Sequence, residues 1–370
     1  MSGAPSIERE FALSHAGYVA FVFAVPLLLA AILEAAIALL SDMRGRRRLV
    51  VAGQAGLAAS LFFVAWTESA WGLTLGLALA GTTSGVACGA AQALLVVDDP
   101  RGTDRAMVRW ALFASIGDLL TPLVTASAIA LGYSYRGATL VVAVVVALQC
   151  AGAAFLRDEA SAAASRDSEP PADPLGVALS RAVRRPRLWA WLFAAASCTL
   201  LDELVVALAT LRFEREQAVR EALAVAAAVT FAAGSVLGAA LADGVVARLG
   251  PRRVLVASAV ACALALGVDV TLRSALASCV ALFVIGLTCA PHHALAQARA
   301  YDEMPANPGT VQALAQLFTA VDVVAPLALG LIADRFGLRA AIACLVLQPL
   351  VIAVCAAWAV DREAERSGAR

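Results

Sequence analysis

The sequence predicts an all-α polytopic membrane protein with two pseudo-symmetric helical bundles, five spans in the first and six in the second. Long apolar runs recur from end to end, arginine-rich turns separate several of them, and short motifs repeat 201 to 204 positions apart. Hydrophobic residues make up 61% of the 370 residues and charged residues only 15%. A soluble domain is about 45–50% apolar and about 25% charged, so a membrane protein is the expected class.

Five apolar runs make up the expected N-terminal bundle. The first extends roughly from Ala16 to Leu40, because about 20 apolar residues are enough to cross the hydrocarbon core. Four more runs follow at roughly 49–66, 72–97, 107–132 and 138–156. We therefore expect a five-span bundle over residues 1–156.

A polar segment, residues 157–187, separates the two bundles. It is rich in serine, acidic residues and arginine and contains a Pro-Pro pair, which is typical of a water-exposed linker. Its end, from Leu175 to Arg185, can form a short amphipathic helix on the membrane surface. Six further apolar runs predict a six-span bundle over residues 188–370 with a charged tail, at roughly 188–211, 221–246, 254–272, 275–298, 309–333 and 338–360.

The distribution of arginine predicts the orientation in the membrane. With the turn at residues 43–48 inside, 20 arginines fall on the cytoplasmic side and 8 on the other, including Arg136 and Arg212. Basic loops stay cytoplasmic, so we expect a multi-pass protein of the plasma (inner) membrane with a cytoplasmic linker and C-terminus. Residues 1–14 then lie outside, and the simplest account is that a first span upstream is missing from this chain.

Composition excludes several function classes. The chain has no lysine, so neither a P-loop nor a Schiff-base enzyme is possible. The net charge is zero, and nothing points to nucleic acid. Three histidines without metal-ligand spacing predict no metal site, and we expect no cofactor. The eight cysteines lie in apolar runs and form no CxxC pair, which favours small buried hydrophobes over disulfides.

An internal repeat supports the two-bundle architecture. Asp118 and Asp322 each precede a proline by four residues and lie 204 positions apart, whereas Asp42 and Asp243 lie 201 apart. Cys88–Leu94 matches Cys289–Leu295 at the same offset of 201. The run at 188–211 has no partner in the first half. Two parallel six-span halves are one known transporter plan, and here the plan is five plus six.

The basic turns resemble a signature of the major facilitator superfamily, Gly-x-x-x-Asp-(Arg/Lys)-x-Gly-(Arg/Lys)-(Arg/Lys). The first copy has Asp42, Gly45, Arg46 and Arg47, but Met43 replaces the first basic residue and Ala38 the leading glycine. The second copy is stretched by four residues and keeps Asp243, Gly250, Arg252 and Arg253. The resemblance implies that these residues latch the bundles as a cytoplasmic gate. The alternative is a basic loop that only sets topology.

A third stretch, Gly330–Arg339, resembles the same signature even more closely. Counting spans places it on the outer side, where the gate is not expected. We therefore interpret it as an ordinary tight turn.

Charged residues inside apolar runs are costly in a membrane and are therefore functional candidates. Asp202 and Glu203 lie near the middle of the run 188–211. In the family that this chain resembles, the first helix of each half lines the central path, so this pair is the strongest candidate for coupling to protons or substrate. Adjacent residues on a helix point about 100° apart, so the two cannot face one direction. A structural polar contact is the alternative.

Weaker candidates for transport or coupling come from five other runs. Asp118 and Asp322 occupy matching repeat positions, where function and a structural role beside the proline are equally open. Glu34 can pair with an arginine near the cytoplasmic end of its span. The last candidates are His292, which can titrate near neutral pH or serve structurally, together with His293 and its first-half counterpart Gln92.

The leading functional hypothesis is a secondary active transporter that moves a small solute by alternating access, coupled to protons. Its partners are the lipid bilayer, a small-molecule substrate and protons. The alternative is a non-transporting sensor or scaffold with the same fold, which the missing first span motivates. No nucleophile–base pair or catalytic metal motif is present, so no enzyme activity is expected.

Overall fold

The computed structural model describes residues 7, 10, 11, 15–41, 46–98, 102–131, 135–155, 173–216 and 221–358. Within these ranges every regular element is a helix. The first repeat comprises α2 (His15–Tyr18), the π-helical turn η1 (Val19–Ala24), α3 (Val25–Ser41), α4 (Arg46–Trp66), α5 (Ala70–Asp98), α6 (Thr103–Ala130) and α7 (Tyr135–Phe155). These helices follow the apolar runs that the sequence predicts.

The second repeat begins after a short helix in the linker, α9 (Leu175–Val183), which confirms the helix expected there. It comprises α10 (Pro186–Glu216), α11 (Glu221–Leu249), α12 (Pro251–Thr271), α13 (Ala275–Glu303), α14 (Pro308–Ala315), the 3₁₀ turn η2 (Gln316–Phe318), α15 (Thr319–Phe336), α16 (Leu338–Cys344) and α17 (Leu347–Trp358). The segments α14, η2 and α15 together cover one predicted span.

Ten helical stretches in the described part of the chain are long and apolar enough to cross a membrane. Helix α6 follows a further predicted span, but most side chains of its second half lie outside the described residues. It spans 28 residues but carries four charged ones, Asp104, Arg105, Arg109 and Asp118. The contacts that these four side chains make are described below.

Two tight turns join consecutive helices in the second repeat through a glycine with positive φ. Gly250 has φ of 80° and Gly337 has φ of 87°, a backbone conformation that glycine adopts without steric cost. Each backbone N–H donates to a carbonyl of the preceding helix, Val246 or Ala333, at 2.9 Å. The stretch Gly330–Arg339 thus contains a tight helix–helix turn at Gly337, as its sequence predicts.

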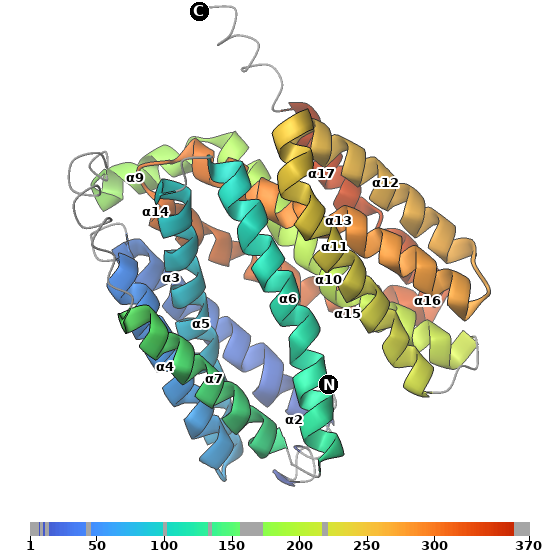
Figure 1. Ribbon diagram of the computed structural model, residues 1–370, viewed down its shortest axis with the longest axis horizontal. Helices are drawn as coiled ribbons and strands as arrows, with labels where there is room; N and C mark the ends of the chain where they lie inside the picture. Colours follow the sequence, from blue (N-terminus) through green and yellow to red (C-terminus); the bar gives the residue numbers. More distant parts are fainter. Residues whose placement is uncertain are drawn as a thin grey trace, which may run out of the picture. The chain divides into compact units, whose positions relative to one another are not determined.

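The helices gather into two compact units. Unit 1 contains Met1–Asp98, Leu120–Val183 and Met304–Thr319. In it α5 packs against α3 and α4, α7 packs against α4, and α14 packs against α3 (Figure 1). Unit 1 therefore contains a segment of the second repeat.

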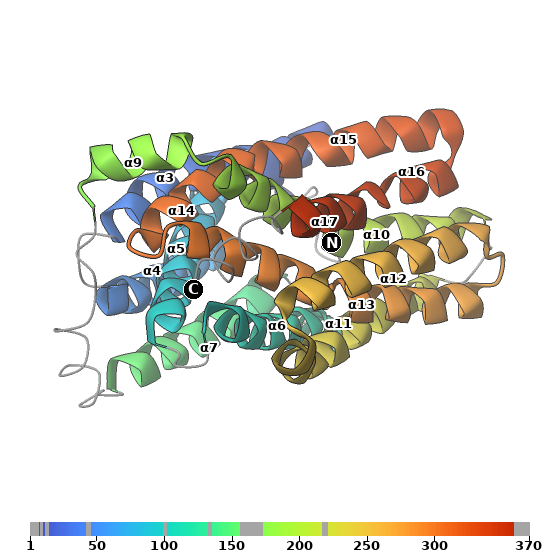
Figure 2. The same cartoon turned by 90° about the horizontal axis from the view of Figure 1, so that it is seen from above.

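Unit 2 contains Asp99–Leu119, Arg184–Glu303 and Ala320–Arg370, so it includes the first part of α6. Helix α13 packs against α10, α11 and α12, and Figure 2 shows α12 and α13 running side by side. The apolar core of unit 2 is formed by side chains from α10, α11, α12, α13, α15 and α16, among them Leu201, Phe213, Phe231, Leu266, Ile285 and Ile342.

Glycine allows α11 and α13 to pack at backbone contact. A Cβ at Gly234 would lie 2.1 Å from the carbonyl oxygen of Phe283, and a Cβ at Gly286 would lie 2.2 Å from that of Phe231. Lipid supplies no hydrophobic drive for helices to associate, so close packing of small residues is a main source of stability in membranes. These glycines therefore hold together the two helices at the centre of unit 2.

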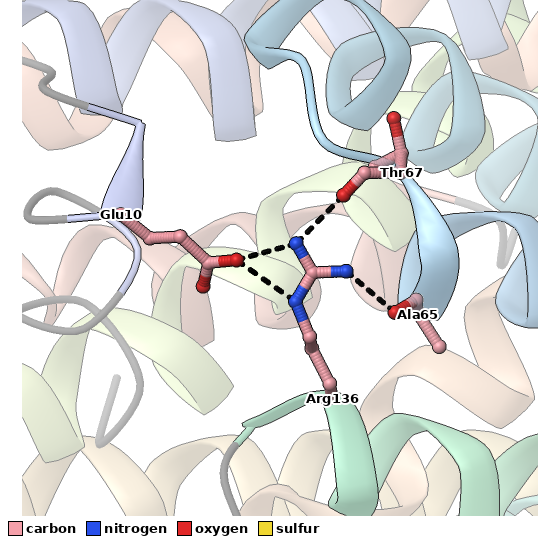
Figure 3. Close-up of polar contacts among 4 residues, drawn as sticks. All are labelled: Glu10, Ala65, Thr67 and Arg136. Carbon is pink, nitrogen blue, oxygen red and sulfur yellow. Dashed lines mark hydrogen bonds and ion pairs between the residues drawn. The ribbon is translucent and has the colours of Figure 1, made fainter.

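An arginine at the start of α7 joins three chain segments in unit 1 (Figure 3). Arg136 donates from Nη1 to the carbonyl oxygen of Ala65 at 2.6 Å and from Nη2 to that of Thr67 at 2.7 Å, where α4 ends. Its Nε donates to Glu10 Oε1 at 2.9 Å. An arginine suits the unpaired carbonyls at a helix C-terminus. Glu10 is thus held at the same end of unit 1 as the α4–α5 turn.

Candidate functional site

Unit 2 brings together four carboxylates from three helices. Asp202 and Glu203 come from α10, Asp118 from α6 and Asp322 from α15. Asp118 repels both Asp202 and Glu203, and Asp322 repels Glu203. Both α10 carboxylates are therefore coupled to Asp118 by charge repulsion. We call these four residues the acidic cluster.

The acidic cluster has few hydrogen-bond donors around it. Asp202, Glu203 and Asp118 are exposed, and Asp322 is half-buried. The Sγ atom of Cys289 on α13 lies 3.7 Å from Asp202 Oδ1, and the Oγ1 atom of Thr199 on α10 lies 2.5 Å from Asp322 Oδ1. Among the described residues no arginine forms an ion pair with the cluster, so its charge is not neutralised by a fixed cation.

His292 has both ring nitrogens occupied in the core of unit 2. The side chain is fully buried on α13. Its Nε2 lies 3.1 Å from Ser258 Oγ, and the amide nitrogen of Gln348 lies 3.3 Å from Nδ1. A neutral ring satisfies both contacts by accepting at Nδ1 and donating from Nε2. This geometry supports the structural role for His292, whereas its neighbour His293 is only half-buried.

Unit 1 contains a separate buried carboxylate, Glu34 on α3, which is 8% exposed. Its Oε1 accepts hydrogen bonds from Gln312 Nε2 at 3.2 Å and from Gln316 Nε2 at 2.6 Å, on α14 and η2. A Cβ at Gly85 on α5 would lie 1.9 Å from Glu34 Oε2. The partners of Glu34 are therefore two amides rather than the expected arginine. We call Glu34, Gln312 and Gln316 the amide clasp.

Gln92 lies on α5, the helix that also carries Gly85 and Gly89. Its side chain is buried. A Cβ at Gly89 would lie 3.0 Å from Gln312 Cγ, so α5 also makes room for the amide clasp.

Asp243, near the end of α11, forms a two-pronged ion pair with the first turn of α6. Arg105 donates from Nε to Oδ1 at 2.6 Å and from Nη2 to Oδ2 at 2.8 Å, and Arg109 Nε lies 3.9 Å from Oδ2. Beside it, Asp104 of α6 pairs with Arg299 of α13. Paired donors of this kind are among the stronger protein hydrogen bonds. We call Asp104, Arg105, Asp243 and Arg299 the ionic clasp.

The other expected gate residues that the structure describes lie at a turn or at the start of a helix. Gly250 forms the turn after α11, and Arg252 and Arg253 are exposed at the start of α12. In the first copy Arg46 and Arg47 begin α4. Asp42 and Gly45 lie outside the described residues.

One buried ion pair was missed by the sequence analysis. Arg212 of α10, assigned there to an outer loop, lies inside the helix and is fully buried with Asp269 of α12. Its Nη2 donates to Asp269 Oδ1 at 2.9 Å and to Ser278 Oγ at 2.7 Å, and its Nη1 donates to the Asp269 carbonyl at 3.0 Å. Asp269 interrupts an apolar run, so the same criterion that selected Asp202 also applies to it.

The described residues contain no group of three or more His, Cys, Asp and Glu side chains placed to hold a metal ion. All eight cysteines are free thiols, and Cys88 is exposed rather than buried as expected. What the described side chains can do is take up protons at carboxylates and hold helices together through ion pairs.

The comparison with family models decides the family. The model of the Major Facilitator Superfamily matches residues 1–227, more than half of the chain. The chain belongs to the major facilitator superfamily. This is a family of multi-pass membrane transporters and not of enzymes, so the family predicted from the sequence is confirmed.

Solved structures share the fold of this superfamily member. The Escherichia coli fucose:proton symporter FucP (N162A) matches with a TM-score of 0.73 at 13% identity, covering 96% of this chain and 92% of that one. The proton:xylose symporter XylE matches with a TM-score of 0.72 at 12% identity, covering 95% and 90%. The human organic anion transporter MFSD10 matches with a TM-score of 0.61 at 16% identity, covering 96% and 88%. No curated protein sequence matches significantly.

Proposed function

We propose that this superfamily member is a proton-coupled secondary transporter that moves a small solute by alternating access. The acidic cluster is the observation that carries the proposal. A carboxylate inside a membrane-spanning helix is costly while it is charged, and protonation removes that cost. Four such groups in one unit, without a paired arginine among the described residues, can alternate between charged and neutral forms as protons bind and leave.

Within the cluster, Asp202 and Glu203 are the proposed coupling pair. Both are electrostatically linked to Asp118, so a proton that binds one carboxylate stabilises the remaining charges on its neighbours. Glu34, Asp118 and Asp322 are proposed as secondary groups, and His292, His293 and Gln92 as weaker ones. FucP and XylE are proton symporters, which favours protons as the coupling ion here.

The ionic clasp is the proposed cytoplasmic gate in the second repeat. Asp243 belongs to the basic-turn signature, and its partner Arg105 belongs to α6 of the first repeat. A contact between the two repeats can form in one state of the cycle and break in another. By the repeat, Asp42 with Gly45, Arg46 and Arg47 forms the matching gate, aided in the second copy by Gly250, Arg252 and Arg253.

The proposed topology follows from the arginine bias. The protein would cross the plasma (inner) membrane with five spans from residues 1–156 and six from residues 188–370. The linker, the C-terminus and the ionic clasp would then be cytoplasmic.

The test is uphill accumulation by the purified protein in lipid vesicles with an imposed pH gradient. The vesicles are offered a defined mixture of sugars, organic acids, amino acids and amines, and their contents are measured by mass spectrometry. We expect at least one solute to accumulate against its gradient and to stop when a protonophore collapses the pH gradient. Accumulation of none would favour the non-transporting sensor or scaffold.

The solute found in this way then tests the coupling pair. Asp202→Asn or Glu203→Gln should abolish accumulation driven by the pH gradient while leaving expression intact. Asp334→Asn is the matched control, because Asp334 is an exposed carboxylate at the end of α15. Normal accumulation in both Asp202→Asn and Glu203→Gln would rule out the role of the pair.

A further inference from the structure

Thr199 lies between two acceptors and has only one proton to donate. Its Oγ1 lies 2.5 Å from Asp322 Oδ1 on α15 and 2.7 Å from the carbonyl oxygen of Ala196 in its own helix, α10. A hydroxyl has one donor and two acceptor lone pairs. The hydroxyl can therefore donate to only one of these acceptors at a time. Whether Asp322 is protonated decides which acceptor receives the hydrogen bond.

Two hydrogen-bond arrangements fit these distances. When Asp322 is ionised, the Thr199 hydroxyl donates a hydrogen bond to the carboxylate. When Asp322 is protonated, the carboxylic acid donates to Thr199 Oγ1, and the Thr199 hydroxyl turns to donate to the Ala196 carbonyl. No bond between heavy atoms forms or breaks. One proton is added to Asp322, and the direction of its hydrogen bond reverses.

Among the described residues, the hydrogen bond from a hydroxyl to this aspartate is found in the second repeat and not at the matching position of the first. Asp118 occupies the position that matches Asp322 in the first repeat. In the described part of the chain no hydroxyl donates to Asp118, whose surroundings differ from those of Asp322 in this respect. Thr199 lies on α10, and the run that forms α10 has no partner in the first half of the sequence. The two related carboxylates are therefore chemically inequivalent.

We propose that Thr199 is a positioning residue for proton binding at Asp322. Its hydroxyl stabilises the ionised form of Asp322, whereas Asp118 receives no such hydrogen bond from a described hydroxyl. The inference rests on the proposed coupling function and deepens it, because it assigns the second-repeat aspartate a built-in donor. Glu203 of α10 also acts on Asp322, by charge repulsion, and no described arginine pairs with it. A charged carboxylate gains more from a donor than a neutral acid does.

Infrared difference spectroscopy of the purified full-length protein tests this without a substrate. The protonated carboxylic acid has its own C=O stretching band, and the component lost in Asp322→Asn is the signal of Asp322. Following this component from acid to alkaline pH gives its titration midpoint. Thr199→Val keeps the shape of the side chain but removes the hydroxyl, and should move the midpoint upward by about one pH unit.

Two controls separate the hydroxyl from general damage. Thr199→Ser keeps the donor and should retain the wild-type midpoint. The Asp118 component, identified with Asp118→Asn, should not move in Thr199→Val. Thr199→Ala provides the same test if the valine variant does not fold.

An unchanged Asp322 midpoint in the variants without the hydroxyl would overturn the proposal. Equal shifts in Thr199→Ser and Thr199→Val would overturn it as well. The outcome is independent of the transport assay, because the midpoint can shift even if no solute accumulates in vesicles. A failure of the proposed function is thus distinguishable from a failure of this inference.

Discussion

Two repeat-related segments of this protein each belong to the compact unit that is built mainly from the other repeat. Asp99–Leu119, with the first part of α6, belongs to unit 2, and Met304–Thr319, with α14, belongs to unit 1. The 204-position offset between Asp118 and Asp322 relates the two segments. Helix α6 is held by the ionic clasp, and α14 is held by the amide clasp.

The difference shows that the repeat preserves where a helix belongs but not the chemistry that holds it. Arg105 and Asp243 are each about a third exposed, so salt can screen their attraction. Glu34 is almost fully buried, and its neutral amide partners are insensitive to salt. We therefore expect the two segments to loosen under different conditions. Hydrogen exchange measured peptide by peptide can follow each segment separately.

The largest expected effect comes from Glu34→Leu. The substitution removes the carboxylate acceptor that the half-buried side-chain amides of Gln312 and Gln316 share, which costs about 1–3 kcal/mol. Hydrogen exchange in α14 should become about ten- to hundredfold faster. Exchange in the first turns of α6 should not change, because those residues belong to the other unit.

Glu34→Gln is the matched control for this prediction. It keeps an oxygen acceptor in place of the carboxylate, so exchange in α14 should rise less than in Glu34→Leu. Unchanged exchange of α14 in Glu34→Leu would show that the amide clasp does not hold this helix.

A smaller effect is expected from Asp243→Asn. The substitution removes the negative charge that Arg105 and Arg109 share, and a partly exposed pair is worth about 1 kcal/mol. Exchange in the first turns of α6 should rise severalfold at low salt, with α14 unaffected. At about 1 M salt, where the screening length is about 3 Å, wild type and variant should converge.

A charge reversal sharpens this test. Arg105→Asp should loosen α6 as Asp243→Asn does, and the double variant Arg105→Asp with Asp243→Arg should restore slow exchange. The ionic clasp would be refuted if the double variant were as fast as the single ones.

The smallest expected effect comes from Gly85→Ala. The new Cβ would meet the end of the flexible Glu34 side chain, which can rotate away at the cost of its aligned hydrogen bonds. Exchange in α14 should rise by less than in Glu34→Leu. Gly244→Ala on α11 is the matched control, because a Cβ there meets nothing within 4 Å. Equal hydrogen exchange of α14 in Gly85→Ala and Gly244→Ala would show that Gly85 does not support the amide clasp.

The sequence by itself determined the helices and the family. Apolar runs of about 20 residues predict spans wherever they occur, because a bilayer demands that length. The sequence predicted the turn at Gly337 because this glycine lies between two such runs. In-span charge also identified Asp202, Glu203, Asp118 and Asp322, since each is conspicuous in an apolar helix. Asp269 satisfied the same criterion but was overlooked, and Arg212 was assigned to a loop that proved to be helix.

Only the tertiary structure decided which side chains meet. Gln316 binds Glu34 across 282 positions, Thr199 binds Asp322 across 123, and Arg212 binds Asp269 across 57. The apolar runs are nearly uniform around their circumference, because lipid and the protein interior both accept apolar residues. Their sequence therefore specifies that a helix forms but not which face it turns toward a neighbour. Close backbone packing at small residues such as Gly234 and Gly286 sets that rotation, and the polar partners follow from it.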